Sequence, residues 1–152
     1  SLPRPAPNVI VHEISEGPIL ETPNGVKVSA FRVEHYPLDE PFGFRFDTKN
    51  KSIAFSGDTC PSENLIKHTH KVDVLVHEST EYTKWDAPDV DHSHKVKTHT
   101  HPEKLGFVAQ DAEPGLLIAT HLMPRSVPWE LREMISEGYK GNLLIGEDLM
   151  TA

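Results

Sequence analysis

Alternation of apolar and polar residues in the first third of the chain predicts β-strands that pair as two hairpins. The expected strands are Asn8–Ile14, Val26–Val33, Phe42–Asp47 and Ser52–Ser56. Thr22-Pro-Asn-Gly25 lies between the first two strands, and its Asn-Gly pair is expected to supply the positive φ angles of a tight hairpin. Thr48–Lys51 joins the other two strands. The proline-rich residues 1–7 are expected to form an extended lead-in.

The pattern changes after residue 60, where predicted helices alternate with short apolar runs. Helices are expected over Ser62–Thr69, Pro102–Gln110 and Pro128–Ser136. Continuous apolar runs, typical of buried strands, are Val72–Val76, Gly115–Thr120 and Asn142–Ile145. Glu81–Thr100 is polar, rich in histidine and without periodicity, so it is predicted to be a loop. Hairpins followed by β–α alternation, without a linker or repeat, predict a single α/β layered domain over residues 1–152.

Acidic residues and histidines directly follow four of the predicted strands. The four dipeptides are Glu34-His35, Gly57-Asp58, His77-Glu78 and Thr120-His121. Sites in such sheets lie at the carboxyl ends of strands, so these side chains are expected at one edge. Imidazole and carboxylate are zinc ligands, and a carboxylate can bridge two metal ions. The alternatives are a turn cap for Asp58 and surface positions for most of the ten histidines.

Composition narrows the classes of function. A net charge of −8 disfavours a protein that binds nucleic acid by neutralising phosphates, because such proteins need a basic face. No apolar run approaches the roughly 18–20 residues of a membrane span, so no membrane partner is expected. The single cysteine, Cys60, allows no internal disulfide and is expected to be a packed thiol. With no signal peptide visible, we expect a cytoplasmic location.

Five short motifs carry a family resemblance. They are Val33-Glu-His-Tyr-Pro37, Phe55-Ser-Gly-Asp-Thr59, Leu75-Val-His-Glu-Ser-Thr80, His99-Thr-His-Pro-Glu103 and Ala119-Thr-His-Leu-Met-Pro124. In this order they resemble the metallo-β-lactamase fold superfamily, in its ribonuclease Z and arylsulfatase-like branch. The resemblance runs from about residue 8 to residue 150. It implies an αββα sandwich, of which this chain is about the C-terminal half.

The resemblance also assigns roles to individual residues. It implies that His35 ligates one Zn²⁺ ion, that His121 ligates a second, and that Asp58 bridges the two. Glu78 and His99 have no metal role in the family pattern. They resemble a pair in which the carboxylate orients an imidazole that passes a proton to the leaving group. The implied activity is that of a hydrolase that uses water activated between two zinc ions.

Other residues near these motifs leave alternatives open. For His77 we prefer a structural hydrogen bond at the strand end. His92, His94 and His101 are expected in a solvated loop beside the pocket, with chelation of a metal by the loop itself as the alternative. Trp85 either lines the substrate pocket or packs as an ordinary aromatic residue.

The His-x-His-x-Asp-His motif of the family is absent. His92-Ser-His94 has the first spacing, but Lys95-Val-Lys97 follows it. Since tetrahedral zinc takes about four ligands, the two protein ligands left for each ion are too few. We therefore expect an N-terminal half bearing that motif, in another segment or chain, to cover a sheet face left exposed here. The alternative is a homodimer that remodels the site.

The sequence also bears on the substrate. The glycine- and proline-rich arm with which ribonuclease Z enzymes hold tRNA has no counterpart here, where only Thr48–Lys51 joins two strands. With the acidic net charge, this favours a small-molecule substrate. The candidates are a carboxylic, phosphoric or sulfuric ester, a lactone, or a halogenated ring open to hydrolytic dehalogenation. The alternatives are a ribonuclease Z-type endonuclease that processes tRNA 3′ ends and a non-catalytic binding module.

Overall fold

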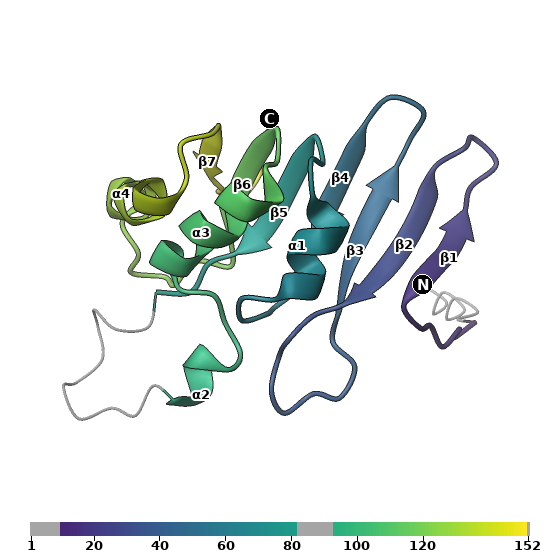
Figure 1. The fold of residues 1–152 in the computed structure, drawn as a ribbon, viewed down its shortest axis with the longest axis horizontal. Coiled ribbons are helices and arrows are strands. Elements are labelled where there is room, and N and C mark those ends of the chain that lie inside the picture. Colours follow the sequence, from purple (N-terminus) through teal and green to yellow (C-terminus); the bar gives the residue numbers. More distant parts are fainter. Residues whose placement is uncertain (1–9, 82–92, 152) are drawn as a thin grey trace, which may run out of the picture.

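The computed structural model describes residues 10–81 and 93–151, which form one sheet with helices packed on it (Figure 1). The strands are β1 (Gly17–Glu21), β2 (Lys27–Arg32), β3 (Phe42–Asp47), β4 (Ser52–Phe55), β5 (Val74–Glu78), β6 (Leu116–Thr120) and β7 (Leu143–Ile145). The helices are α1 (Glu63–Thr69), α2 (Ser93–Val96), α3 (Pro102–Ala112) and α4 (Pro128–Gly138). No helix in these two ranges is long and apolar enough to cross a membrane.

The strands lie in the sheet in the order of the sequence, from β1 to β7. Neighbours are antiparallel from β1 to β4 and parallel from β4 to β7. As a result β2, β4, β5 and β6 run in the same direction, and their carboxyl ends meet at one edge of the sheet. This confirms the expectation that the residues after these four strands share an edge.

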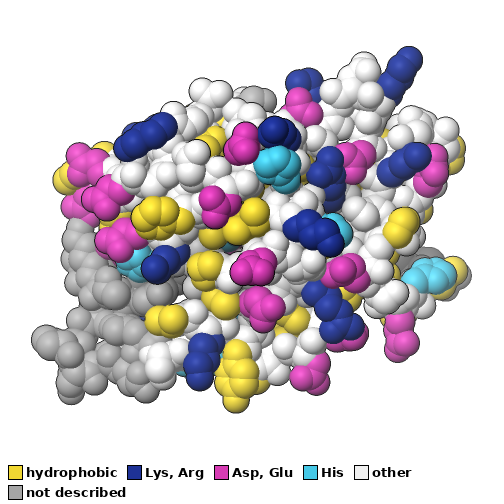
Figure 2. Space-filling view, viewed as in Figure 1, with side chains coloured by type: hydrophobic (Ala, Val, Ile, Leu, Met, Phe, Trp, Pro, Cys, Tyr) yellow, Lys and Arg dark blue, Asp and Glu magenta, His cyan; other side chains and the backbone are white. Residues whose placement is uncertain are grey.

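One face of the sheet is covered by helices and contains the main core. Leu75 on β5 and Leu117 on β6 are fully buried against α3 and α4, which contribute Leu105 and Ile135. Fully burying a leucine or isoleucine side chain stabilises a fold by roughly 1.5–3 kcal/mol. The outer surface on this side, seen in Figure 2, mixes acidic, basic and apolar side chains and is an ordinary solvated surface.

No described helix covers the opposite face of the sheet, although that face is apolar. Its residues alternate along the strands with the buried ones and remain partly exposed; they include Phe44, Phe46, Ile53, Phe55, Val74, Val76, Leu116, Ile118 and Leu144. Phe55 is 39% exposed. The expectation of an exposed sheet face is confirmed for the described residues.

Three local predictions were wrong. Residues 10–14 are not a strand, residues 8 and 9 lie outside the described ranges, and the strand that pairs with β2 is β1. In the turn between β1 and β2 only Gly25 has a positive φ, 84°, so the turn needs one left-handed residue rather than two. In the predicted loop Glu81–Thr100, of which residues 81 and 93–100 are described, those residues include a helical turn, α2, which is too short to produce a periodic pattern.

Two glycines set the distance between α3 and α4. A Cβ on Gly106 would overlap the carbonyl oxygen of Ile135. A Cβ on Gly138 would lie 2.8 Å from the carbonyl carbon of Gly106. Because these contacts are with the backbone, no side-chain adjustment relieves them, and the helices cannot approach this closely without both glycines.

We predict that Gly106→Ala lowers the free energy of unfolding by about 1–3 kcal/mol, the cost typical of overpacking. Gln110→Ala, at an exposed position on the same helix, is the control and is expected to change stability by less than about 0.5 kcal/mol. Urea denaturation followed by circular dichroism measures both variants. Equal stability of the two would contradict the packing argument.

Candidate metal centre

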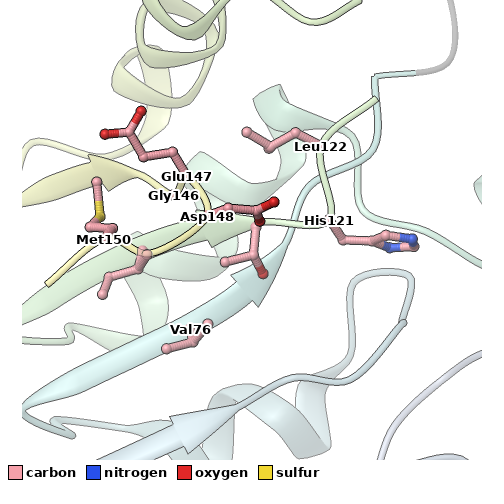
Figure 3. A pocket seen from close by; sticks show the side chains of 9 residues that line it. Val76, His121, Leu122, Gly146, Glu147, Asp148 and Met150 are labelled. Atoms are coloured by element: carbon pink, nitrogen blue, oxygen red, sulfur yellow. The ribbon is translucent and has the colours of Figure 1, made fainter. Parts of the chain in front are cut away.

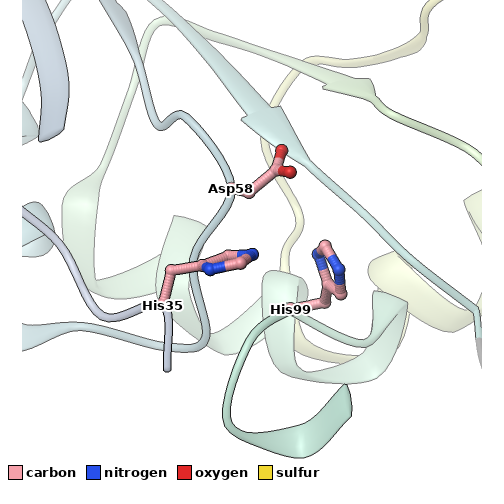
Figure 4. A group of neighbouring side chains, drawn as sticks. All are labelled: His35, Asp58 and His99. Atoms are coloured by element: carbon pink, nitrogen blue, oxygen red, sulfur yellow. The ribbon is translucent and has the colours of Figure 1, made fainter. Parts of the chain in front are cut away.

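Histidine and carboxylate side chains from several loops converge at the edge where the parallel strands end. Ligand atoms of His35, Asp58 and His99 all lie within 4.8 Å of one another. Figure 4 shows these three side chains turned toward one another from three separate segments. A second group with the same spacing consists of Glu78, His99 and His121. The structure thus brings together all five residues that the resemblance singled out.

Two hydrogen bonds hold the loop after β2 against the loop after β4. The backbone N–H of Cys60 donates to the carbonyl oxygen of Glu34 at 2.8 Å. The backbone N–H of Glu34 donates to Oγ1 of Thr59 at 3.0 Å. His35 directly follows Glu34, and Asp58 directly precedes Thr59. The two bonds therefore hold His35 beside Asp58.

Asp58 is presented to solvent by a sharp turn. Gly57 has a φ of 63°, and a Cβ there would lie 2.8 Å from the carbonyl oxygen of Phe42. The Asp58 and His121 side chains are both about half exposed, and Oδ1 of Asp58 lies 3.1 Å from Nδ1 of His121. The two are therefore accessible and close enough to act on a shared ligand.

His99 lies between the two histidines that were predicted to bind metal. Its ring centroid is 5.3 Å from that of His35 and 5.4 Å from that of His121. Sequence reasoning gave His99 no metal role, and that assignment stays a prediction. Its position in both groups makes it a further candidate ligand, which the strand-end pattern missed because His99 precedes a helix rather than following a strand.

The orientation of His99 depends on the buried carboxylate of Glu78. Oε1 of Glu78 lies 3.0 Å from Nδ1 of His99, which leaves Nε2 as the ring nitrogen not engaged by Glu78. Burial lowers the pKa of His99. Burial also raises the pKa of Glu78 to about 7, although hydrogen bonds from surrounding groups oppose that rise. Glu78 and His99 therefore form a close pair in a site that is largely shielded from solvent.

Three threonines supply the other donors to Glu78. The backbone N–H groups of Thr59 and Thr100 donate to Oε1 at 3.2 and 3.0 Å. The hydroxyl of Thr80 donates to Oε2 at 3.2 Å. Sequence reasoning did not assign these residues, although each lies within one of the five motifs. Their position within these motifs was the signal in the sequence that could have identified them.

Comparison with known proteins identifies the family. A family model described as the beta-lactamase superfamily domain matches residues 1–122. The chain belongs to this superfamily. Ribonuclease Z from Mycobacterium tuberculosis (strain H37Rv) is 27% identical over 150 residues, which cover 94% of this chain and 54% of that protein. Ribonuclease Z from Mycobacterium sp. (strain KMS) is also 27% identical, over 94% of this chain and 51% of that protein.

Solved structures confirm the fold. The metallo-beta-lactamase fold protein YhfI from Bacillus subtilis superposes with a TM-score of 0.70 at 21% identity, over 86% of this chain and 50% of that one. The short form of human tRNase Z gives a TM-score of 0.60 at 24% identity, over 88% of this chain and 43% of that one. The chain therefore has the α/β architecture of the metallo-β-lactamase fold and spans about half the length of these superfamily members.

The described residues fit the metal ions that the superfamily implies. Nδ1 of His35 is buried, and no described group forms a hydrogen bond with it. Such a nitrogen gains a partner when a metal ion binds nearby, since a buried unpaired polar atom is otherwise costly. The imidazole and carboxylate donors of His35, Asp58 and His121 are the types that zinc prefers.

His77 and Cys60 lie close to the candidate centre in the sequence but belong to neither ligand group. His77 is buried, Nδ1 lies 2.7 Å from the carbonyl oxygen of Glu78, and burial lowers the pKa of His77 to about 4. The predicted structural hydrogen bond is thus confirmed. Cys60 is partly buried, burial raises the pKa of its thiol, and it belongs to neither ligand group.

The remaining loop residues are only partly described. His94 is exposed on α2 and belongs to neither ligand group. His101 immediately precedes α3 and is partly buried. His92 and Trp85 lie outside the described residues, so their predicted roles are untested.

A pocket of about 520 Å³ adjoins the centre on the uncovered side of the sheet. Val76 and Ile118 from the apolar face line it, and His121 stands at its border (Figure 3). Glu147 and Asp148 add carboxylates to the lining. The candidate centre therefore lies next to the apolar face that the described helices leave open.

Proposed function

We propose that this chain is part of a zinc-dependent hydrolase and supplies His35, Asp58 and His121 as metal ligands. The observation that carries the proposal is the convergence of histidine and carboxylate ligand atoms from separate loops at one sheet edge. Membership of the beta-lactamase superfamily supports it. Two zinc ions bound there would supply Lewis acidity and a nucleophilic water near neutral pH.

Metal binding and proton transfer would then depend on different residues of this chain. Asp58 is about half exposed, belongs to one ligand group with His35 and lies 3.1 Å from His121, so its two carboxylate oxygens could serve two ions. Glu78 holds Nδ1 of His99 and fixes the ring. Nε2 of His99 is left to hold the proton that the leaving group takes up as the ester bond breaks.

We further propose that a segment bearing His-x-His-x-Asp-His completes the centre, in another part of the same protein or in another chain. The greater length of the relatives supports this, since this chain spans about half of each. The open apolar face and the pocket beside His121 give such a segment a surface to pack against. A second copy of this chain is the alternative occupant.

The substrate we favour is a small ester-like molecule, on the grounds of the acidic net charge and the short Thr48–Lys51 turn. This expectation is not confirmed by the comparisons, because the relatives described above are named ribonuclease Z. Their similarity supports tRNA 3′ processing as a second candidate. Cleavage of precursor tRNA without hydrolysis of small esters would favour that candidate.

Replacing the shared carboxylate tests the metal centre directly. In the protein completed by the segment bearing His-x-His-x-Asp-His, we expect Asp58→Asn to weaken zinc binding by about 100-fold or more, because loss even of a group that only supports a ligand costs about 10–100-fold. Isothermal titration calorimetry measures the affinity. Asp111→Asn makes the same chemical change at an exposed position on α3 and should leave the affinity unchanged. Equal zinc affinities for the two variants would contradict the assignment.

Replacing His99 tests the proton-transfer role. In the metal-loaded, completed enzyme, His99→Ala should slow hydrolysis by a factor on the order of 10²–10⁴ while metal content is retained. The loss should be smaller for substrates with better leaving groups, which need less protonation. His70→Ala, an exposed histidine after α1, serves as the control.

The dependence on leaving group separates two roles of His99. An equal loss for all leaving groups would count against proton transfer. Loss of a metal ion from His99→Ala would identify His99 as a ligand instead, in keeping with its place in both ligand groups.

A further inference from the structure

A second pocket, of about 450 Å³, lies between the loop that joins β2 to β3 and the helix α2. His35 belongs both to its lining and to the candidate metal centre. Its other walls include Tyr36, Leu38 and Val96, which are 61%, 60% and 52% exposed. Large apolar side chains that are exposed together around one pocket, rather than scattered singly, are a feature of binding regions.

Backbone hydrogen bonds hold the two walls of this pocket in place. The N–H of Tyr36 donates to the carbonyl oxygen of Lys97 at 3.1 Å. The N–H of Leu38 donates to the carbonyl oxygen of His35 at 2.8 Å. The two segments accordingly lie side by side at the same end of the molecule (Figure 1). The aromatic wall therefore keeps a fixed position relative to the metal centre.

Two cations belong to the described lining of this pocket, and they have different partners. Arg32 is paired with Glu40. Lys97 lies with its Nζ 5.8 Å from the ring centroid of Tyr36, and it forms no ion pair within residues 10–81 and 93–151. Glu34 and Asp39 also line the pocket, so its charge is mixed rather than basic. This composition suits a flat, weakly polar group better than a strongly anionic one.

We propose that this pocket binds a planar aromatic group of the substrate, next to the ester that reaches the metal centre. The inference rests on the proposed function and adds to it the class of substrate. The ring would lie on Tyr36, with Leu38 and Val96 around it and the ammonium of Lys97 at its border. Stacking of a ring on an aromatic side chain strengthens binding in protein complexes with nucleic acids. The imidazole and carboxylate ligands of the metal centre would not by themselves favour an aromatic substituent over an aliphatic one.

Binding of two phosphonates to the zinc-loaded protein, completed by the segment bearing His-x-His-x-Asp-His, tests the pocket without requiring turnover. We expect phenylphosphonate to bind about tenfold more tightly than methylphosphonate in isothermal titration calorimetry. Tyr36→Ala should abolish this preference, and Tyr36→Phe should retain it. Phe107→Ala removes an aromatic side chain of similar exposure, 59%, from α3 and should have no effect.

The outcomes distinguish the pocket from the metal centre. Equal binding of the two phosphonates, or a phenyl preference that survives Tyr36→Ala, would overturn the assignment of this pocket to an aromatic group. If zinc still binds in that case, the proposed function stands. Failure of the completed protein to bind zinc at the sheet edge would overturn both. A change in oligomeric state of Tyr36→Ala without a change in phosphonate binding would show that Tyr36 contacts another chain, and would also overturn the pocket.

The aromatic group could be a small aryl substituent or a nucleobase, and a second pair of ligands separates these sources. Adenosine 5′-monophosphate is compared with ribose 5-phosphate in the same titration. A Tyr36-dependent preference for the nucleotide larger than that for phenylphosphonate identifies a nucleobase. The reverse order identifies a small aryl ester. Either result supports a site for planar aromatic groups.

Discussion

The buried carboxylate of Glu78 is the interaction on which the arrangement of the candidate centre depends. It is 2% exposed and accepts hydrogen bonds from backbone groups in the loops after β4 and before α3. It also fixes His99, whose ring stands between His35 and His121. A carboxylate in so dry a site is costly unless its oxygens are satisfied, so these loops must stay in place for Glu78 to be tolerated. The same bonds that compensate for burial therefore position the centre.

Much of the fold can be predicted from the sequence, because the pattern of apolar residues is clearest in the segments that are most buried. The runs that became β5, β6 and β7 are mostly apolar, and each matched its strand within two residues at either end. Four strands lead into acidic residues or histidines at their carboxyl ends, and these strands run in one direction. The side chains of those acidic residues and histidines therefore meet at one edge of the sheet. The conclusion that Asp58 and His121 lie together needed only that topology, and they are 3.1 Å apart.

The parts that could not be predicted depend on tertiary contacts or on very short segments. The strand β1 contains Gly17 and Pro18, which disfavour strands in the interior of a sheet, but β1 pairs only with β2 at the edge, where proline is tolerated. The helix α2 is a single turn without buried residues, so no periodicity marks it. The threonine donors to Glu78 act mostly through backbone N–H groups, whose partners no residue pattern reveals.

The central claim is that the sheet edge holds zinc through His35, Asp58 and His121. The most direct measurement is anomalous X-ray scattering at the zinc absorption edge, from crystals of the protein grown with zinc. The account predicts an anomalous peak at bonding distance, about 2.0–2.2 Å, from a nitrogen of His35 and an oxygen of Asp58, with His121 at a second peak. Zinc bound only at other histidines, such as His94 or His101, with none at the sheet edge, would contradict it.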